Sequence, residues 1–108
     1  MEKPKNSLQD KEIIELILKR DESGLEAIKD KYNSYLFTIA NNVLDSEEDS
    51  LECVNDTYKK VWDSIPPNEP NNLRGYAGKI TRNLAINKYK YNTRDKRNKN
   101  YDLSQDRS

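Results

Sequence analysis

Apolar residues recur at every third or fourth position between residues 25 and 43, and this spacing limits the possible folds more than any other feature. The series comprises Leu25, Ile28, Tyr32, Tyr35, Leu36, Ile39 and Val43. Such a series lies along one face of an α-helix, so it predicts a helix from about Ser23 to Leu44 with one buried side. Asp21-Glu22-Ser23-Gly24 interrupts the pattern before it.

A second stripe follows and has a clear start and stop. Ser46 can cap the helix, Asp49 stands at the third helical position of a shortened capping box, and acidic residues favour the helix start. The stripe comprises Leu51, Val54, Tyr58, Val61, Trp62 and Ile65. Pro66-Pro67 ends this helix, because proline lacks the N–H and disfavours helix in the preceding residue.

Shorter patterns flank these two helices. Asp10 can cap a first helix that runs to about Arg20 and buries Ile13, Ile14 and Ile17. Residues 66–72 read PPNEPNN, which predicts a loop, and Asn71 or Asn72 can cap a last helix to Arg97. That helix would bury Leu73, Tyr76, Ala77, Ile80, Leu84 and Tyr91.

These patterns predict an all-α fold, a compact bundle of about four helices with no sheet. The apolar fraction of 33% suits a thin core. We expect a flexible N-terminus at residues 1–9, the helical domain at 10–97 and a flexible C-terminal tail at 98–108.

The composition argues against several functions. The chain has one Cys (Cys53) and no His, which excludes an internal disulfide, a Cys/His metal cluster and His-based catalysis. We expect no cofactor. Glu52 and Asp56, like Glu47 and Glu48, have a spacing ordinary for an exposed helix face, so an enzyme is not favoured. No signal-like or membrane-length apolar run appears, which predicts a cytoplasmic protein.

The net charge of zero hides a strong asymmetry. Residues 1–70 carry nine basic and 16 acidic side chains, whereas residues 71–108 carry ten basic and three acidic ones. One interpretation is two different partners, one of them anionic. The other is that the two halves neutralise each other within the fold.

The stretch Leu73 to Arg97 concentrates the basic residues. Arg74, Lys79, Arg82, Lys88, Arg94 and Lys96 can offer charge to phosphates. Asn83 and Asn87 lie one helical turn apart and can contact base edges. Tyr76, Tyr89 and Tyr91 could stack on bases, although Tyr76 fits the core. A solvated basic helix remains the alternative.

Three segments resemble region 2 of an extracytoplasmic-function (ECF) type sigma factor of bacterial RNA polymerase. They are GLEAIKDKYNSYLFTIANNVL, DSEEDSLECVNDTYKKVWDSI and NLRGYAGKITRNLAINKY. The last two are similar to the family patterns Asp-Val-Val-Gln-Glu-Thr-Phe and Leu-Arg-x-Trp-Leu-x-Arg-Ile-Ala-Arg-Asn-x-Ala. Their order and spacing agree over residues from about 10 to 97.

The resemblance implies a function in transcription initiation. The third helix would dock on the coiled-coil clamp helices of the largest polymerase subunit, through Glu52, Asn55, Asp56, Lys59, Lys60 and Asp63. The loop Ile65 to Asn72 would capture a flipped base of the promoter −10 element. The last helix would hold the single non-template strand, through Arg74, Lys79, Arg82, Asn83, Asn87 and Lys88, with Asn71 and Asn72 before them.

The chain departs from the family pattern at several positions. Asn55 and Asp56 stand for Gln and Glu, and Tyr76 stands for Trp. Gly75 and Gly78 weaken a helix, so we expect the start of the last helix to be loosely packed.

The chain also departs from the family in its domain content. Such factors normally continue into a further helical domain that reads the −35 element. Either this chain is a piece of a longer protein, which we expect, or the protein lacks that domain. An anti-sigma factor is a further possible partner. The alternative function is a sigma-like helical module that binds polymerase or a regulator without recognising DNA.

Overall fold

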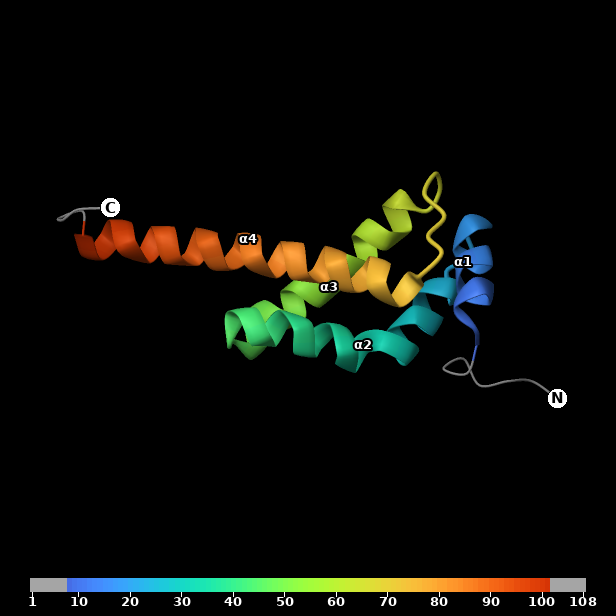
Figure 1. Cartoon of the computed structure of the whole chain (residues 1–108), viewed down its shortest axis with the longest axis horizontal. Helices are drawn as coiled ribbons and strands as arrows, with labels where there is room; N and C mark the ends of the chain where they lie inside the picture. Colours follow the sequence, from blue (N-terminus) through green and yellow to red (C-terminus); the bar gives the residue numbers. More distant parts are fainter. Residues whose placement is uncertain (1–7, 102–108) are drawn as a thin grey trace.

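The chain folds into four α-helices. The structure is a computed structural model that describes the backbone of residues 8–101 and the side chains of residues 8–94. The helices are α1 (Asp10–Leu18), α2 (Ser23–Leu44), α3 (Glu47–Ser64) and α4 (Leu73–Tyr101), and residues 8–101 contain no strand. The all-α prediction is confirmed. Figure 1 shows α1 lying across one end of the bundle, close to the loop that joins α3 to α4.

The first helix starts differently from the prediction. Gln9, not Asp10, is the N-cap, and its backbone N–H donates to Glu12 Oε1 at 2.9 Å. The Asp10 carboxylate is occupied elsewhere, accepting from the Tyr32 hydroxyl at 2.7 and 2.8 Å and from Lys31 Nζ at 2.9 Å. Asp10 therefore fastens α1 to α2 instead of capping α1.

The α2–α3 hairpin follows the sequence pattern closely. The Asp21 carboxylate accepts from both the backbone N–H and the hydroxyl of Ser23, the first residue of α2. Asp45 ends α2 with a left-handed φ of 49°. Ser46 Oγ then accepts from the backbone N–H of Asp49 at 3.2 Å, so the predicted N-cap of α3 is confirmed.

The core fills the space between the four helices. The predicted residues Ile13, Ile14 and Ile17 are buried. The later helices bury only part of each predicted stripe. The members that are only partly buried are Leu25, Tyr35, Ile39, Val43, Trp62, Tyr76, Ile80 and Leu84. The buried apolar side chains of the main cluster are Ile13, Ile14, Ile17, Ala27, Ile28, Tyr32, Leu36, Val54, Tyr58, Val61, Ile65, Leu73 and Ala77. Leu51 was expected in the core but is 45% exposed.

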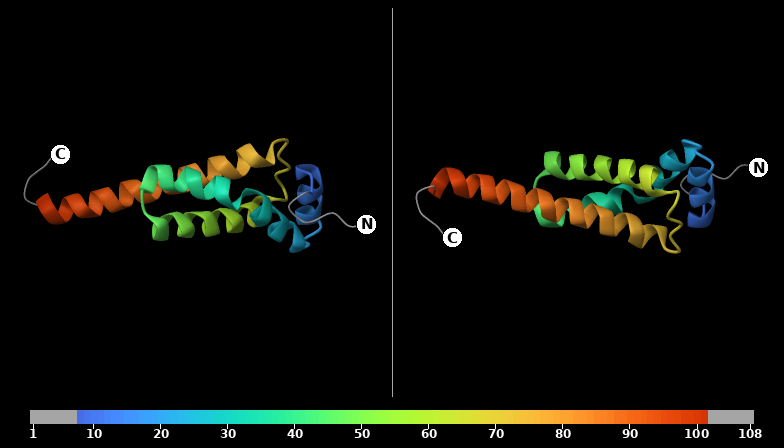
Figure 2. Two further views of the ribbon diagram at one scale, coloured as in Figure 1. Left: turned by 90° about the horizontal axis from the view of Figure 1, so that it is seen from below. Right: turned by 90° about the horizontal axis from the view of Figure 1, so that it is seen from above.

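Helix α4 is longer than predicted and leaves the bundle. It continues to Tyr101, so residues 98–101, expected in a flexible tail, are helical, and residues 102–108 lie outside the described part. Figures 1 and 2 show its C-terminal half running past the turn between α2 and α3. Tyr91, predicted to be buried, is 61% exposed and lies at the border of a groove between α3 and α4.

The start of α4 is closely packed, contrary to the expectation drawn from its glycines. Leu73 and Ala77 are fully buried, and Gly78 is buried against α2. A Cβ on Gly78 would lie 2.8 Å from Tyr35 Oη and 3.2 Å from Ile39 Cδ1. The missing side chain thus lets α4 approach α2, and this packing offsets the weak helix propensity of glycine.

Candidate nucleic-acid and polymerase interface

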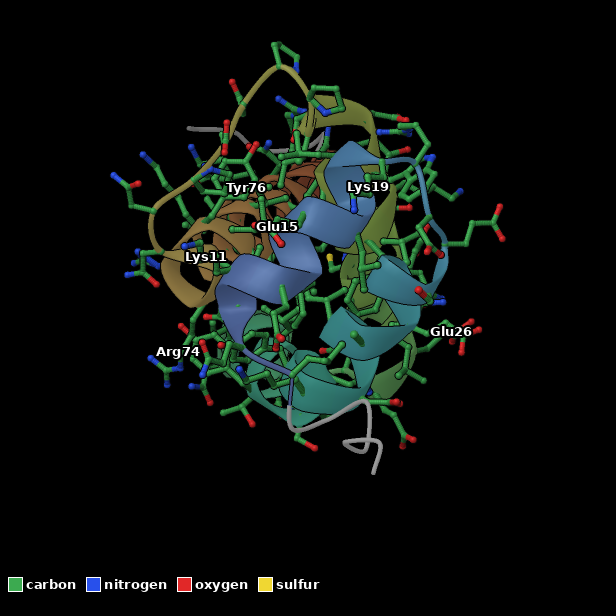
Figure 3. All side chains as sticks on the ribbon, turned by 90° about the vertical axis from the view of Figure 1, so that its right-hand side faces the viewer. Lys11, Glu15, Lys19, Glu26, Arg74 and Tyr76 are labelled. Atoms are coloured by element: carbon green, nitrogen blue, oxygen red, sulfur yellow. The ribbon has the colours of Figure 1, made fainter. Side chains whose placement is uncertain are left out.

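The loop before α4 is tied to the helices on both sides of it. The Tyr76 hydroxyl lies 2.6 Å from Ser64 Oγ and accepts from Asn68 Nδ2 at 2.9 Å. The backbone N–H of Asn68 also donates to the Ser64 carbonyl at 2.8 Å. Tyr76, on the first turn of α4, thereby holds the end of α3 and the middle of the loop. Figure 3 shows Tyr76 within the curve of this loop, at the end of the bundle that α1 covers.

Asn72 is the residue that caps α4. Its Oδ1 accepts from the backbone N–H of Gly75 at 3.0 Å, and its carbonyl accepts from the backbone N–H of Tyr76 at 2.9 Å. Of the two candidates that the sequence left open, Asn71 is exposed and Asn72 is the cap. Asn72, one of the four asparagines predicted to bind DNA, thus has its side-chain oxygen occupied.

The predicted DNA-binding residues of α4 do not share one face. At 3.6 residues per turn, Lys79, Arg82 and Asn83 fall within an arc of about 100°. All three are exposed on the side of α4 away from the core. Arg74 lies about 180° from Asn83 around the axis. Its guanidinium stacks on Tyr35, 3.9 Å from the ring centroid.

The predicted polymerase-binding residues of α3 do share a face. The six residues span an arc of about 140° on the outer side of the helix. Asp56 is half-buried and the other five are exposed, namely Glu52, Asn55, Lys59, Lys60 and Asp63. The structure therefore brings this whole set together as one surface.

The two predicted surfaces meet at a salt bridge between α3 and α4. Lys88 Nζ lies 2.8 Å from Glu52 Oε1, and this hydrogen bond raises the pKa of Lys88 above its ordinary value. Next to the pair is an open groove of about 290 Å³. Its lining residues are Glu52, Cys53, Asp56, Leu84, Asn87, Lys88 and Tyr91. Asn87 thus borders the α3 surface, and at Glu52–Lys88 the acidic and basic halves do neutralise each other.

Two threonines that the sequence interpretation did not select set the position of α4. Thr57 Oγ1 and Thr81 Oγ1 lie 2.7 Å apart, and both side chains are fully buried. Each hydroxyl is also within hydrogen-bond distance of a carbonyl in its own helix, that of Cys53 for Thr57 and that of Ala77 for Thr81. Because each hydroxyl has one proton, one threonine donates to the other, which in turn donates to its own helix carbonyl. Because Thr81 precedes Arg82, this contact fixes the rotation that exposes Arg82 and Asn83. A threonine on the inner side of each helix was the available signal.

Comparison with known families identifies the chain. The family model of sigma-70 region 2 matches residues 28–95, which include most of α2, all of α3 and most of α4. The chain belongs to the sigma-70 region 2 family, a non-enzymatic domain of transcription initiation factors that binds core RNA polymerase and promoter DNA. Searches of curated proteins and of solved structures gave no significant match. No helix within residues 8–101 has the length and apolar character needed to cross a membrane.

Proposed function

We propose that this chain is the region 2 domain of an ECF type sigma factor that docks on the polymerase clamp helices and captures the melted −10 element. The observation that carries the proposal is the placement of the exposed Lys79, Arg82 and Asn83 on the second and third turns of α4, which follows a loop with exposed polar residues. Charged side chains on such a face bind phosphates, and an amide can select a base.

Base capture would supply part of the energy for promoter opening. Unstacking and unpairing a base costs a few kcal/mol, and a site that binds only the unpaired base offsets this cost. In this proposal the loop at residues 66–72 receives the base, with the exposed Asn71 at its rim. The Lys79–Arg82–Asn83 surface follows the backbone of the non-template strand.

The same proposal assigns the outer face of α3 to polymerase. Its exposed acidic and basic side chains form a mixed surface, which suits docking on a charged coiled coil. Asp56 is the half-buried member of this face and lies on the groove. A carboxylate that lines a groove loses more solvent on docking than an exposed charge at the periphery of the interface. We therefore expect Asp56 to be the position most sensitive to substitution.

The experiment for DNA binding uses labelled single-stranded oligonucleotides. A panel of −10-like non-template sequences and scrambled versions is titrated with the 108-residue chain, and affinity is measured by fluorescence anisotropy. Arg82→Ala and Asn83→Ala should weaken binding of the preferred strand. Lys60→Ala removes an exposed cation from α3 and should leave this binding unchanged. Equal affinity for all strands, or no effect of either α4 variant, contradicts the DNA assignment.

The polymerase face is tested separately with the clamp coiled coil. Asp56→Ala should weaken its capture by the chain, and Lys79→Ala serves as the matched control on α4. An unchanged interaction in Asp56→Ala removes the α3 assignment.

A protein-interaction module that does not recognise DNA is the second candidate. The observations that favour it are that Arg74 is stacked on Tyr35 and Lys88 is paired with Glu52, so two of the predicted DNA-binding cations have partners within the fold. The salt dependence of strand binding distinguishes the candidates. Phosphate contacts make affinity fall steeply as salt rises, whereas a chain that binds no DNA has no such slope to measure.

A further inference from the structure

Arg20 reaches from the turn between α1 and α2 to the end of α3. Its Nη1 donates to the carbonyls of Trp62, at 3.0 Å, and Ile65, at 2.7 Å. The guanidinium carbon also lies 3.8 Å from the centroid of the Trp62 ring. One side chain thus contacts the last turn of α3 in two ways, from more than 40 positions earlier in the chain.

The contact supplies what the end of α3 lacks. The last carbonyls of a helix have no partner within the helix, and α3 ends at Ser64 because Pro66 disfavours helix at Ile65, which is extended. A guanidinium there makes charge-assisted hydrogen bonds and is favoured by the helix dipole. Arg20 itself has a left-handed φ of 60°, the turn conformation from which its side chain reaches α3.

Arg20 therefore fixes the point at which the loop at residues 66–72 begins. The middle of the loop is held by Asn68 on the Tyr76 hydroxyl, and its end is held by the Asn72 cap. Between these points Pro67, Glu69 and Asn71 are exposed. The loop is thus attached at its start, middle and end, while much of its outer edge is open to a ligand.

We infer that Arg20 is a positioning residue for base capture, one that acts through the Trp62 and Ile65 carbonyls and does not touch the nucleic acid. This inference rests on the proposed function of the loop. A loop ordered before binding does not have to be ordered by the ligand, so its affinity for an unpaired base is higher. Without Arg20 the start of the loop is no longer fixed. Part of the free energy of binding the base is then needed to order the loop, so the affinity falls.

The contact itself can be tested first, because Trp62 is the single tryptophan of the chain. Arg20→Gln removes the cation from the ring, so Trp62 emission should change and quenching by acrylamide should increase. Lys19→Gln removes a neighbouring exposed cation and should change neither signal. Identical emission and quenching in wild type and Arg20→Gln would mean that the contact does not exist in solution.

The role in base capture is tested with two strands. One is the best-bound oligonucleotide of the panel, and the other carries an abasic site at the base whose removal costs most affinity. Arg20→Gln should lower the affinity for the intact strand by roughly three- to tenfold, which corresponds to the cost of ordering one or two further groups. The same substitution should leave the affinity for the abasic strand unchanged. Arg20→Lys should restore part of the lost affinity for the intact strand.

Three other outcomes are informative. Equal weakening of both strands, especially with a salt slope reduced by about one, means that Arg20 contacts phosphate directly and overturns the inference. Unchanged binding of the intact strand overturns it as well. If the wild type does not prefer the intact strand over scrambled or abasic ones, the proposed function itself fails. Circular dichroism and thermal melting exclude a folding defect, and Arg20→Lys replaces Arg20→Gln if the latter does not fold.

Discussion

Thr57 and Thr81 face each other in the interior with their hydroxyl oxygens 2.7 Å apart, and neither side chain is exposed to solvent. The pair joins α3, which carries the proposed polymerase surface, to α4, which carries the proposed DNA surface. A polar contact in an apolar interior is satisfied in one arrangement of the helices, so it specifies how α4 is rotated against α3.

The threonine pair predicts coupled effects on stability. Thr57→Val and Thr81→Val should each lower the free energy of unfolding by about 1 kcal/mol, because each leaves a buried hydroxyl with one partner fewer. The double variant should lose less than the sum, since both hydroxyls are then replaced together. Urea unfolding measures all three. Thr38→Val, an exposed threonine on α2, is the control, and strictly additive losses would contradict the coupling.

The close approach of α4 to α2 predicts that alanine substitutions at the two glycines of α4 have unequal effects on stability. Gly78→Ala should destabilise the protein by about 1–3 kcal/mol, because the added Cβ meets Tyr35 Oη and overpacks the contact. Gly75→Ala meets the Asn72 side chain and disturbs the α4 cap, but it also gains helix propensity, so its net effect should be close to neutral. Thermal unfolding compares them. Tyr35→Phe should partly rescue Gly78→Ala, and a stabilised Gly78→Ala would show that helix propensity prevails over packing.

The Glu52–Lys88 salt bridge predicts a pH effect on the alkaline side. The hydrogen bond to Glu52 raises the pKa of Lys88, so Glu52→Gln should return that pKa toward 10.5, as followed by NMR of the lysine side chain. Because the pKa of Lys88 is higher in the folded chain than in the unfolded one, its ion pair contributes fully to stability below the unfolded-state pKa. This contribution is lost as pH rises through the folded-state pKa. The stability difference between wild type and Glu52→Gln should therefore shrink at high pH. Because the pair is exposed, the effect should be small and salt-sensitive. A difference that grows with pH would contradict this pairing.

The buried thiol predicts slow chemistry at neutral pH. Cys53 is 3% exposed, and burial raises the pKa of its thiol. Since the thiolate is the reactive form, alkylation of the native chain should be far slower than in urea and should accelerate as pH rises. Cys53 is the single cysteine, so mass spectrometry follows one site. Modification at the same rate in the native and urea-unfolded chains would show that the α3–α4 contact opens readily.

Much of the fold is readable from local pattern. The bounds of α2, the Ser46 cap of α3 and the buried Ile13, Ile14 and Ile17 follow from residue spacing and capping chemistry, which act within one or two helical turns. The grouping of the six α3 side chains on one face follows from helical periodicity in the same way. The assignment of that face to polymerase remains a proposal.

The partners of the polar residues could not be read in this way. Whether Asn71 or Asn72 caps α4 depends on the path of the loop. Arg74 and Lys88 were both predicted to bind DNA. The fold instead stacks Arg74 on Tyr35 and pairs Lys88 with Glu52. Each of these pairings joins residues more than 30 positions apart, so it depends on the crossing and rotation of whole helices.

The sequence by itself determined which segments are helical, most of the residues on their inner faces and the family, because hydrophobic periodicity and family motifs are properties of contiguous residues. The tertiary structure alone decided which cations stay free and how the loop before α4 is held by Arg20 and Tyr76. The physical reason is that a hydrogen bond or ion pair requires two atoms within about 3 Å. That precision arises only when the packed core has set the position of every helix.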